Sequence, residues 1–107
     1  MAYYLIQIAY TPEAWAAQIK NPQNRVEAVR PVMEKLGGSF EGAWYAFGEY
    51  DVIAICNMPD NVSAAAFSLA AMAGGAVKAF KTTPLMTTEE GIEAMKKAGA
   101  AGYRPPG

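Results

Sequence analysis

The sequence predicts an α+β domain in which a four-stranded antiparallel sheet carries helices on one face. Three observations in its 107 residues support this fold class. Runs rich in aromatic and β-branched residues, which are typical of strands, occur four times. Helix-start signals follow the first and the third run. A two-residue connection that contains glycine joins the second run to the third, as in a hairpin. The order is therefore β-α-β-β-α-β with an extra C-terminal helix, which is the ferredoxin-like arrangement.

The first part of the chain is predicted to hold one strand and two helices. Residues 3–10, YYLIQIAY, form the strand, which stops before a proline. Thr11 suits the N-cap of a short helix over residues 12–19, because a proline and an acidic residue follow it directly. Asn21 and Pro22 repeat this start signal, so a longer helix capped by Asn21 is expected up to residue 36, where apolar residues recur at helical spacing up to a glycine pair. Pro31 predicts a kink or a break in this helix at the preceding residue.

The two central strands, residues 39–47 and 50–58, are predicted to form a hairpin around Gly48 and Glu49. Glycine in the first position of a two-residue connection favours a type II′ turn, which sets the register of the strands. Facing residues share a side of the sheet, so the register also assigns the two faces. One face is expected to carry Tyr45, Phe47, Tyr50, Val52, Ala54 and Cys56, and the other Phe40, Trp44, Asp51, Ile53 and Ile55. Large apolar residues therefore lie on both faces.

The last part of the chain is predicted to supply a helix, a strand and a further helix. Asp60 or Asn61 caps an alanine-rich helix that runs to residue 72. Residues 76–83 form the fourth strand, whose two lysines suit an edge position. A capping box at Thr87 then begins the C-terminal helix.

The C-terminal helix also sets the expected domain boundary. It is predicted to end near residue 98 and to bury Ile92 and Met95 on its inner side. Residues 1–98 are therefore expected to form one ferredoxin-like domain. Residues 99–107, which contain two prolines and no hydrophobic period, are expected to be an extended or disordered tail.

The composition argues against several classes of protein. Nine basic residues nearly balance ten acidic ones, so no nucleic-acid partner is expected. No apolar run approaches the length that a membrane span needs, so a cytoplasmic protein without a membrane partner is predicted. The chain has no histidine, which removes the usual general base and the commonest haem and zinc ligand. Cys56 is the single cysteine and is expected to be a small buried hydrophobe. Neither a cofactor nor a metal site is therefore predicted.

An uncovered sheet face predicts a partner subunit. Right-handed crossovers place both central helices on the same side of the sheet, so the other side stays open. Because that side also carries large apolar residues, we expect a second copy to pack against it through a two-fold axis. A homodimer, or a higher homo-oligomer, follows.

Four stretches of the chain, TPEAW, IKNPQNRVEAVRPVMEKLGG, FGEYDV and GAVKAFKTTP, resemble the GYD-domain family. The resemblance extends from Tyr3 to Met95, and Gly48, Tyr50 and Asp51 match the signature after which the family is named. It implies a dimeric α/β barrel, in which two ferredoxin-like subunits bring their sheets together. The family has no agreed catalytic residues. Other branches of the same barrel superfamily include cofactor-independent monooxygenases, isomerases and haem-handling enzymes, an analogy of fold that does not determine function.

Asp51 is the candidate catalytic residue. If it shares a face with Trp44 and Ile53, its carboxyl is partly removed from water and suits a proton shuttle or a contact to a polar ligand. The alternative is that it accepts hydrogen bonds near a turn, where aspartate is common. No second titratable partner is evident beside it.

Aromatic residues form the candidate ligand site. Trp15, Trp44, Tyr45 and Tyr50, together with Asp51, are expected to line a pocket for a planar molecule, or else to belong to the core or the dimer interface. Arg25 and Arg30 are candidates for an anion clamp, but residues five apart point to different sides of a helix, so a solvated surface position is expected instead.

Three functions therefore stay open. The first is a homodimer that binds an apolar or aromatic small molecule between sheet and helices. The second is a cofactor-independent monooxygenase-like or isomerase-like enzyme with Asp51 as acid or base. The third is a structural protein whose apolar surface serves oligomerisation only.

Overall fold

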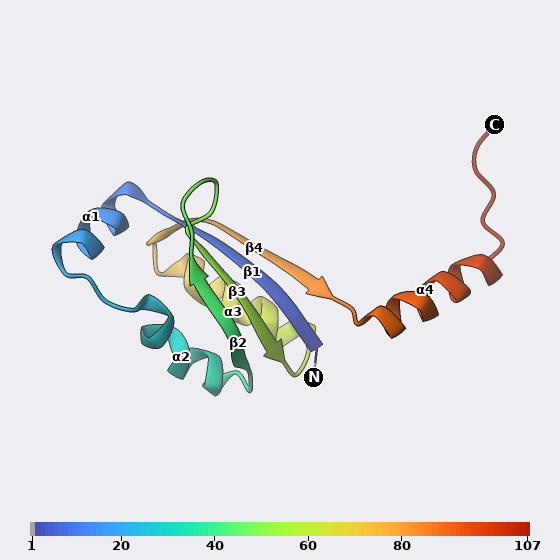
Figure 1. The fold of residues 1–107 in the computed structure, drawn as a ribbon, viewed down its shortest axis with the longest axis horizontal. Helices are drawn as coiled ribbons and strands as arrows, with labels where there is room; N and C mark the ends of the chain where they lie inside the picture. Colours follow the sequence, from blue (N-terminus) through green and yellow to red (C-terminus); the bar gives the residue numbers. More distant parts are fainter. Residues whose placement is uncertain (1) are drawn as a thin grey trace.

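A computed structural model describes residues 2–107 and confirms the predicted α+β fold (Figure 1). The neighbours in its single sheet follow the order β2-β3-β1-β4, and each pair is antiparallel. This is the strand order of a ferredoxin-like domain, with α1 and α4 added to the basic pattern. The elements in chain order are β1 (Ala2–Tyr10), α1 (Pro12–Lys20), α2 (Arg25–Lys35), β2 (Ser39–Tyr45), β3 (Val52–Met58), α3 (Asn61–Ala73), β4 (Val77–Leu85) and α4 (Thr88–Ala100).

Side-chain caps begin all four helices. Thr11 accepts a hydrogen bond from the Ala14 amide at 3.1 Å, and Asp60 accepts one from the Ser63 amide at 2.7 Å. Thr87 forms the predicted capping box at the start of α4. For α2 the cap is Asn24, three residues later than predicted, so the chain from residue 21 to residue 24 is a linker. The helix then continues through Pro31 without a break.

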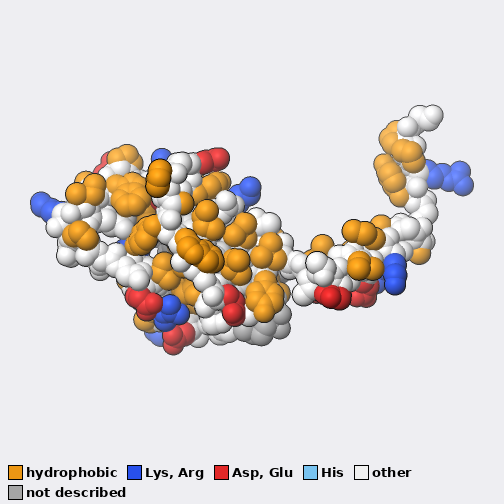
Figure 2. All heavy atoms as spheres, in the orientation of Figure 1, with side chains coloured by type: hydrophobic (Ala, Val, Ile, Leu, Met, Phe, Trp, Pro, Cys, Tyr) orange, Lys and Arg blue, Asp and Glu red, His pale blue; other side chains and the backbone are white. Residues whose placement is uncertain are grey.

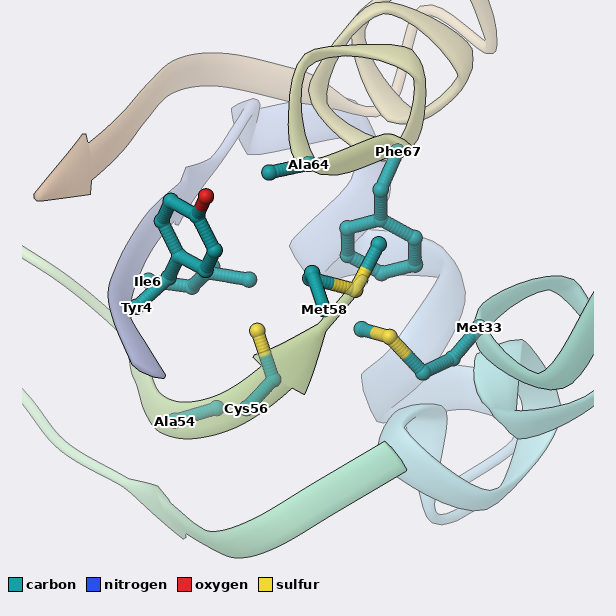
Figure 3. Packing of buried hydrophobic residues seen from close by; sticks show 8 residues of the cluster. All are labelled: Tyr4, Ile6, Met33, Ala54, Cys56, Met58, Ala64 and Phe67. Atoms are coloured by element: carbon teal, nitrogen blue, oxygen red, sulfur yellow. The ribbon is translucent and has the colours of Figure 1, made fainter. Parts of the chain in front are cut away.

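The core lies on one face of the sheet, between the strands and the helices α2 and α3. Figure 3 shows Met33 of α2, Met58 of β3 and Phe67 of α3 pointing toward one another. Inward-facing residues of β1 and β3, among them Ile6 and Cys56, complete the cluster. The face that carries Val52, Ala54 and Cys56 in the predicted hairpin is therefore the helix-covered face, because these residues alternate with less buried ones along β3.

The central hairpin differs from the prediction at its turn. Strand β2 ends at Tyr45 and β3 begins at Val52, so a six-residue loop, 46–51, replaces the predicted two-residue turn. The register between the strands is nevertheless as predicted, with Tyr45 opposite Val52. Asp51 connects the loop to both neighbouring strands, because its carbonyl accepts from the Ala46 amide at 2.7 Å and its amide donates to the Ile8 carbonyl of β1 at 2.7 Å. Phe47, which was expected to face Tyr50 across the turn, is fully exposed.

A β-bulge corrects the predicted faces of β2. Phe40 pairs with Cys56 and Gly42 with Ile55, so Glu41 is an extra residue on β2. A bulge shifts the alternation of side chains by one position, and Phe40 therefore lies on the helix-covered face instead of the open face. There its ring makes an edge contact with Phe67, with centroids 6.1 Å apart.

The open face of the sheet is rich in apolar side chains, which Figure 2 shows gathered over the strands. Tyr3 and Trp44 are 44% and 59% exposed on it. Helix α4 extends away from the sheet (Figure 1), and its Ile92 and Met95 are exposed. The predicted burial of these two residues within the chain is therefore wrong, because α4 leaves the sheet beyond the end of the edge strand β4.

Candidate functional site

A cavity of about 250 Å³ lies between the sheet and the helices α2 and α3. Apolar side chains make up most of its wall. Inward-facing residues of β1 and β3 form the floor, and valines on the inner side of α2 form one flank. The opposite flank belongs to α3.

Small residues on α3 leave this space open. Ala70, Ala71 and the C-cap residue Gly74 line the cavity from the same face of the helix. None of them has a side chain long enough to reach the sheet. One turn earlier on the same helix, Phe67 fills the gap and joins the packed core. The interior is thus solid at the Phe67 end of α3 and hollow at the Gly74 end.

Two polar side chains, Tyr10 and Arg25, project from an otherwise apolar lining. Tyr10 is the last residue of β1 and is only 8% exposed. Burial raises the pKa of its phenol, the neighbouring Tyr45 phenol adds to this rise, and the Arg25 guanidinium opposes it. These effects place Tyr45 and Arg25 close to the Tyr10 hydroxyl.

Tyr45 holds the start of α2 in position. Its hydroxyl accepts a hydrogen bond from the Arg25 amide at 3.1 Å and donates one to the Gln23 carbonyl at 3.3 Å. Asn24 accepts from the next two amides of the helix, so the exposed amides of this first turn are all paired. Arg25 therefore stands at a fixed place on the rim of the cavity.

Asp51 lies beside the end of β1 and does not belong to the cavity lining. Its Oδ2 accepts a hydrogen bond from the Tyr10 amide at 2.9 Å and one from the Trp15 indole Nε1 at 3.2 Å. The Trp15 ring meets the Tyr10 ring edge-on, with centroids 5.5 Å apart. Asp51 thus joins the end of β1 to α1 and the loop 46–51, and it is not among the described residues that line the cavity. A catalytic role for it stays a prediction.

The candidate aromatic residues lie in separate places. Trp15 contacts Tyr10 edge-on, whereas Tyr45 contacts the start of α2. Trp44 lies mostly exposed on β2, where it and Tyr45 line a shallow groove of about 210 Å³ beside α2. Tyr50 lies half-buried in the loop 46–51. Within residues 2–107 the structure therefore does not bring the four aromatic rings together around one cavity.

The residues that the sequence reasoning missed are Tyr10 and Arg25. A signal for Tyr10 was present, because it continues the inward alternation of Tyr4, Ile6 and Ile8 along β1. Arg25 stands four residues before Val29, in the apolar stripe of α2, which also places it on the inner side of the helix. The expectation of a solvated surface position was wrong for Arg25.

Neither a reactive cysteine nor a metal site is found among residues 2–107. Burial raises the pKa of the Cys56 thiol to about 11, so the group is protonated and unreactive near neutral pH. In the stretch from Ala2 to Gly107, no three metal-ligating side chains come together in one group. Nor does any helix in this stretch have the length and apolar character needed to cross a membrane.

Comparisons with known proteins identify a family. A search of curated proteins found no match. The family model of the GYD domain matches residues 4–95. Within that match, Gly48 has a φ of 149°, a conformation that favours glycine. It lies in the same loop as Asp51, whose amide donates to a carbonyl of β1. Because the match covers most of the chain, including residues of all four strands, the loop and the helices that enclose the cavity, the chain belongs to the GYD-domain family.

Proposed function

We propose that this protein is a homodimer that binds an apolar or aromatic small molecule in the cavity between the sheet and the helices α2 and α3. The observation that carries the proposal is the lining, which is apolar except for Tyr10 and Arg25. Ligand sites in proteins commonly combine an apolar wall with a few polar groups that orient the ligand. A cavity with such a lining stabilises water poorly, because a buried water molecule needs two to four polar partners.

The size of the cavity limits the ligand. An engineered apolar cavity of about 150 Å³ accepts benzene. The cavity here has about 250 Å³, which suits one substituted aromatic ring or a short aliphatic chain. A fused system of several rings would require α2 and α3 to move apart.

The open face of the sheet supports the proposed dimer. Tyr3 and Trp44 are exposed there, and Ile53 and Ile55 are half-buried beside them. Contiguous apolar surface of this kind commonly marks an interface, and a two-fold axis would bring two identical sheets face to face. Sedimentation should report twice the chain mass of 11.4 kDa, and Trp44→Glu should shift the protein to monomer. A wild-type monomer at all concentrations tested would exclude the dimer.

A cavity-filling variant tests the binding site. Ala71→Leu adds three carbon atoms to the wall of the cavity, whereas the matched Ala73→Leu adds them at an exposed position of the same helix. With benzyl alcohol and indole as probes, titration calorimetry should show weak binding to the wild type and to Ala73→Leu, and a loss of at least tenfold for Ala71→Leu. Equal affinity in all three proteins would place any binding outside this cavity.

The two other functions make different demands. A purely structural protein would bind none of the probes, so the titration separates it from the proposed function. An enzyme of the monooxygenase or isomerase type would need a proton-transfer group in contact with its substrate, and Asp51, outside the cavity lining, has its Oδ2 engaged by two donors. Both alternatives, like the cytoplasmic location, stay predictions.

A further inference from the structure

The geometry points to a ligand that carries a carboxylate: we infer that Arg25 and Tyr10 hold this anionic group at the rim of the cavity, while its aromatic or short aliphatic body occupies the apolar interior. The inference rests on the proposed function and names the class of ligand that the same cavity takes.

The two arginines of α2 differ in how their charge is balanced. Arg30 forms a two-pronged ion pair with Glu27, with nitrogen–oxygen distances of 2.8 and 3.0 Å, on the outside of the domain. Arg25 is half-buried on the cavity rim, and no carboxylate of residues 2–107 lies within ion-pairing distance of it. A partly buried cation without a counter-ion is unfavourable, so an anion from outside the chain would stabilise this arrangement.

Tyr10 supplies the second contact. Its side chain is more than nine-tenths buried and lines the cavity, and the Arg25 guanidinium lies within reach of its hydroxyl. Because the pKa of the phenol is raised, the hydroxyl keeps its proton and can donate to an anion. A buried hydroxyl that keeps its proton, beside a guanidinium without a carboxylate partner, is the arrangement that a carboxylate ligand would satisfy, with two acceptor oxygens for two sets of donors.

Arg25 and Tyr10 are each held in place by a side chain that does not line the cavity. Tyr45 fixes the backbone of Arg25, and Asp51 fixes the backbone of Tyr10. The Asp51 carboxylate also acts on the Tyr10 phenol, but its effect is smaller than that of the Arg25 guanidinium. Arg25 is also the one charged side chain among the described residues that line the cavity, so an incoming anion meets a positive charge there. Groups that are already fixed lose little freedom when a ligand binds, which favours affinity.

Matched pairs of compounds test the inference. Phenylacetate and phenylacetamide differ in charge but hardly in shape, and hexanoate and hexanamide form a second pair with an aliphatic body. Titration calorimetry with the wild type should show each carboxylate binding at least tenfold more tightly than its amide, as expected when charged hydrogen bonds are gained. The preference should weaken as the salt concentration rises.

Three variants locate the effect. Arg25→Gln should abolish the preference for the carboxylate, and Arg25→Lys should keep part of it, because the lysine keeps the charge but lacks the planar fork. Tyr10→Phe should reduce the preference severalfold. Arg30→Gln, on the same helix but outside the cavity, should leave it unchanged. Thermal unfolding of each variant shows whether it is folded before it is titrated.

The outcomes separate this inference from the proposed function. If each amide binds as tightly as its carboxylate, or if Arg25→Gln keeps the full preference, the anionic group is excluded while the apolar binding site stands. If none of the four compounds, nor indole or benzyl alcohol, binds the wild type, both proposals are overturned.

Discussion

Replacement of Asp51 by alanine should destabilise the protein, because this carboxylate joins three parts of the fold. Its Oδ2 accepts from the Tyr10 amide at 2.9 Å and from the Trp15 indole at 3.2 Å. Its own backbone amide donates to the Ile8 carbonyl at 2.7 Å and does not depend on the side chain. The substitution therefore removes two hydrogen bonds and leaves the loop backbone able to pair with β1.

The expected magnitude follows from the two donors. Loss of the carboxylate leaves the amide of a buried residue without an acceptor, which costs about 1–3 kcal/mol. The longer bond to the Trp15 indole, at 3.2 Å, is expected to contribute about 0.5–1.5 kcal/mol. Together they give about 1.5–4.5 kcal/mol of lost unfolding free energy for Asp51→Ala. Asp51→Asn keeps one acceptor oxygen but loses the charge, so its cost should be smaller.

Urea denaturation followed by tryptophan fluorescence measures this loss. The midpoint should fall by about 1–2 M for Asp51→Ala, given the usual dependence of the unfolding free energy on urea for a chain of this size. Glu49→Ala, an exposed change two residues away in the same loop, is the matched control and should stay within about 0.5 kcal/mol of the wild type. A double-mutant cycle with Trp15→Phe isolates the bond between the two side chains, with an expected coupling of about 1 kcal/mol.

Two results would refute the reasoning. An Asp51→Ala midpoint equal to that of Glu49→Ala would show that the carboxylate does not hold Tyr10 and Trp15. Strict additivity of Asp51→Ala and Trp15→Phe would show that the indole bond contributes nothing, even if the first variant is destabilised.

Three further predictions concern the core. Gly38→Ala should lower the unfolding free energy by about 1–3 kcal/mol, because a Cβ there would lie 2.7 Å from a backbone carbonyl oxygen. The control Gly91→Ala adds its methyl group to the open space around α4, so it should be neutral or stabilising in the same urea titration. Phe67→Ala should cost about 3–5 kcal/mol, against less than about 0.5 kcal/mol for the exposed Leu69→Ala; equal costs would contradict the packing of α3 on the sheet. Cys56 should not react with a thiol reagent at pH 8 until the protein is unfolded. Because the unfolded thiol loses its proton from about pH 8.5 and the folded one only near pH 11, the unfolding free energy should fall as the pH rises through this interval; a flat profile would exclude the burial effect.

Local signals were enough for most of the secondary structure. The helix caps Thr11, Asp60 and Thr87 were recognised from one to four neighbouring residues, and the structure confirms each of them. These features depend on chemistry within a single turn of helix, which a sequence contains in full. The linker before α2 was missed because two capping signals, at Asn21 and at Asn24, stand three residues apart, and only the second begins a helix.

The wrong predictions concern features that depend on contacts between residues distant in the chain. The two-residue turn at Gly48 was wrong, and the loop 46–51 that replaces it is held to β1 by the Asp51 carboxylate, which accepts from the Tyr10 amide 41 residues away. The bulge at Glu41 moved Phe40 to the other face, and a bulge has no clear mark in a single sequence. The position of Arg25 at the cavity depends on how far α2 and α3 stand from the sheet.

The sequence by itself determined the number and order of the strands and most of the helix starts, because these follow from residue type and from spacing along the chain. It also showed that both faces of the central strands are apolar. Only the tertiary structure decided that the Asp51 carboxylate binds the Tyr10 amide and that a cavity remains between the sheet and the small residues Ala70 and Ala71. The physical reason is that a cavity is defined by side chains that fail to reach one another across separate elements, and no local pattern contains that distance.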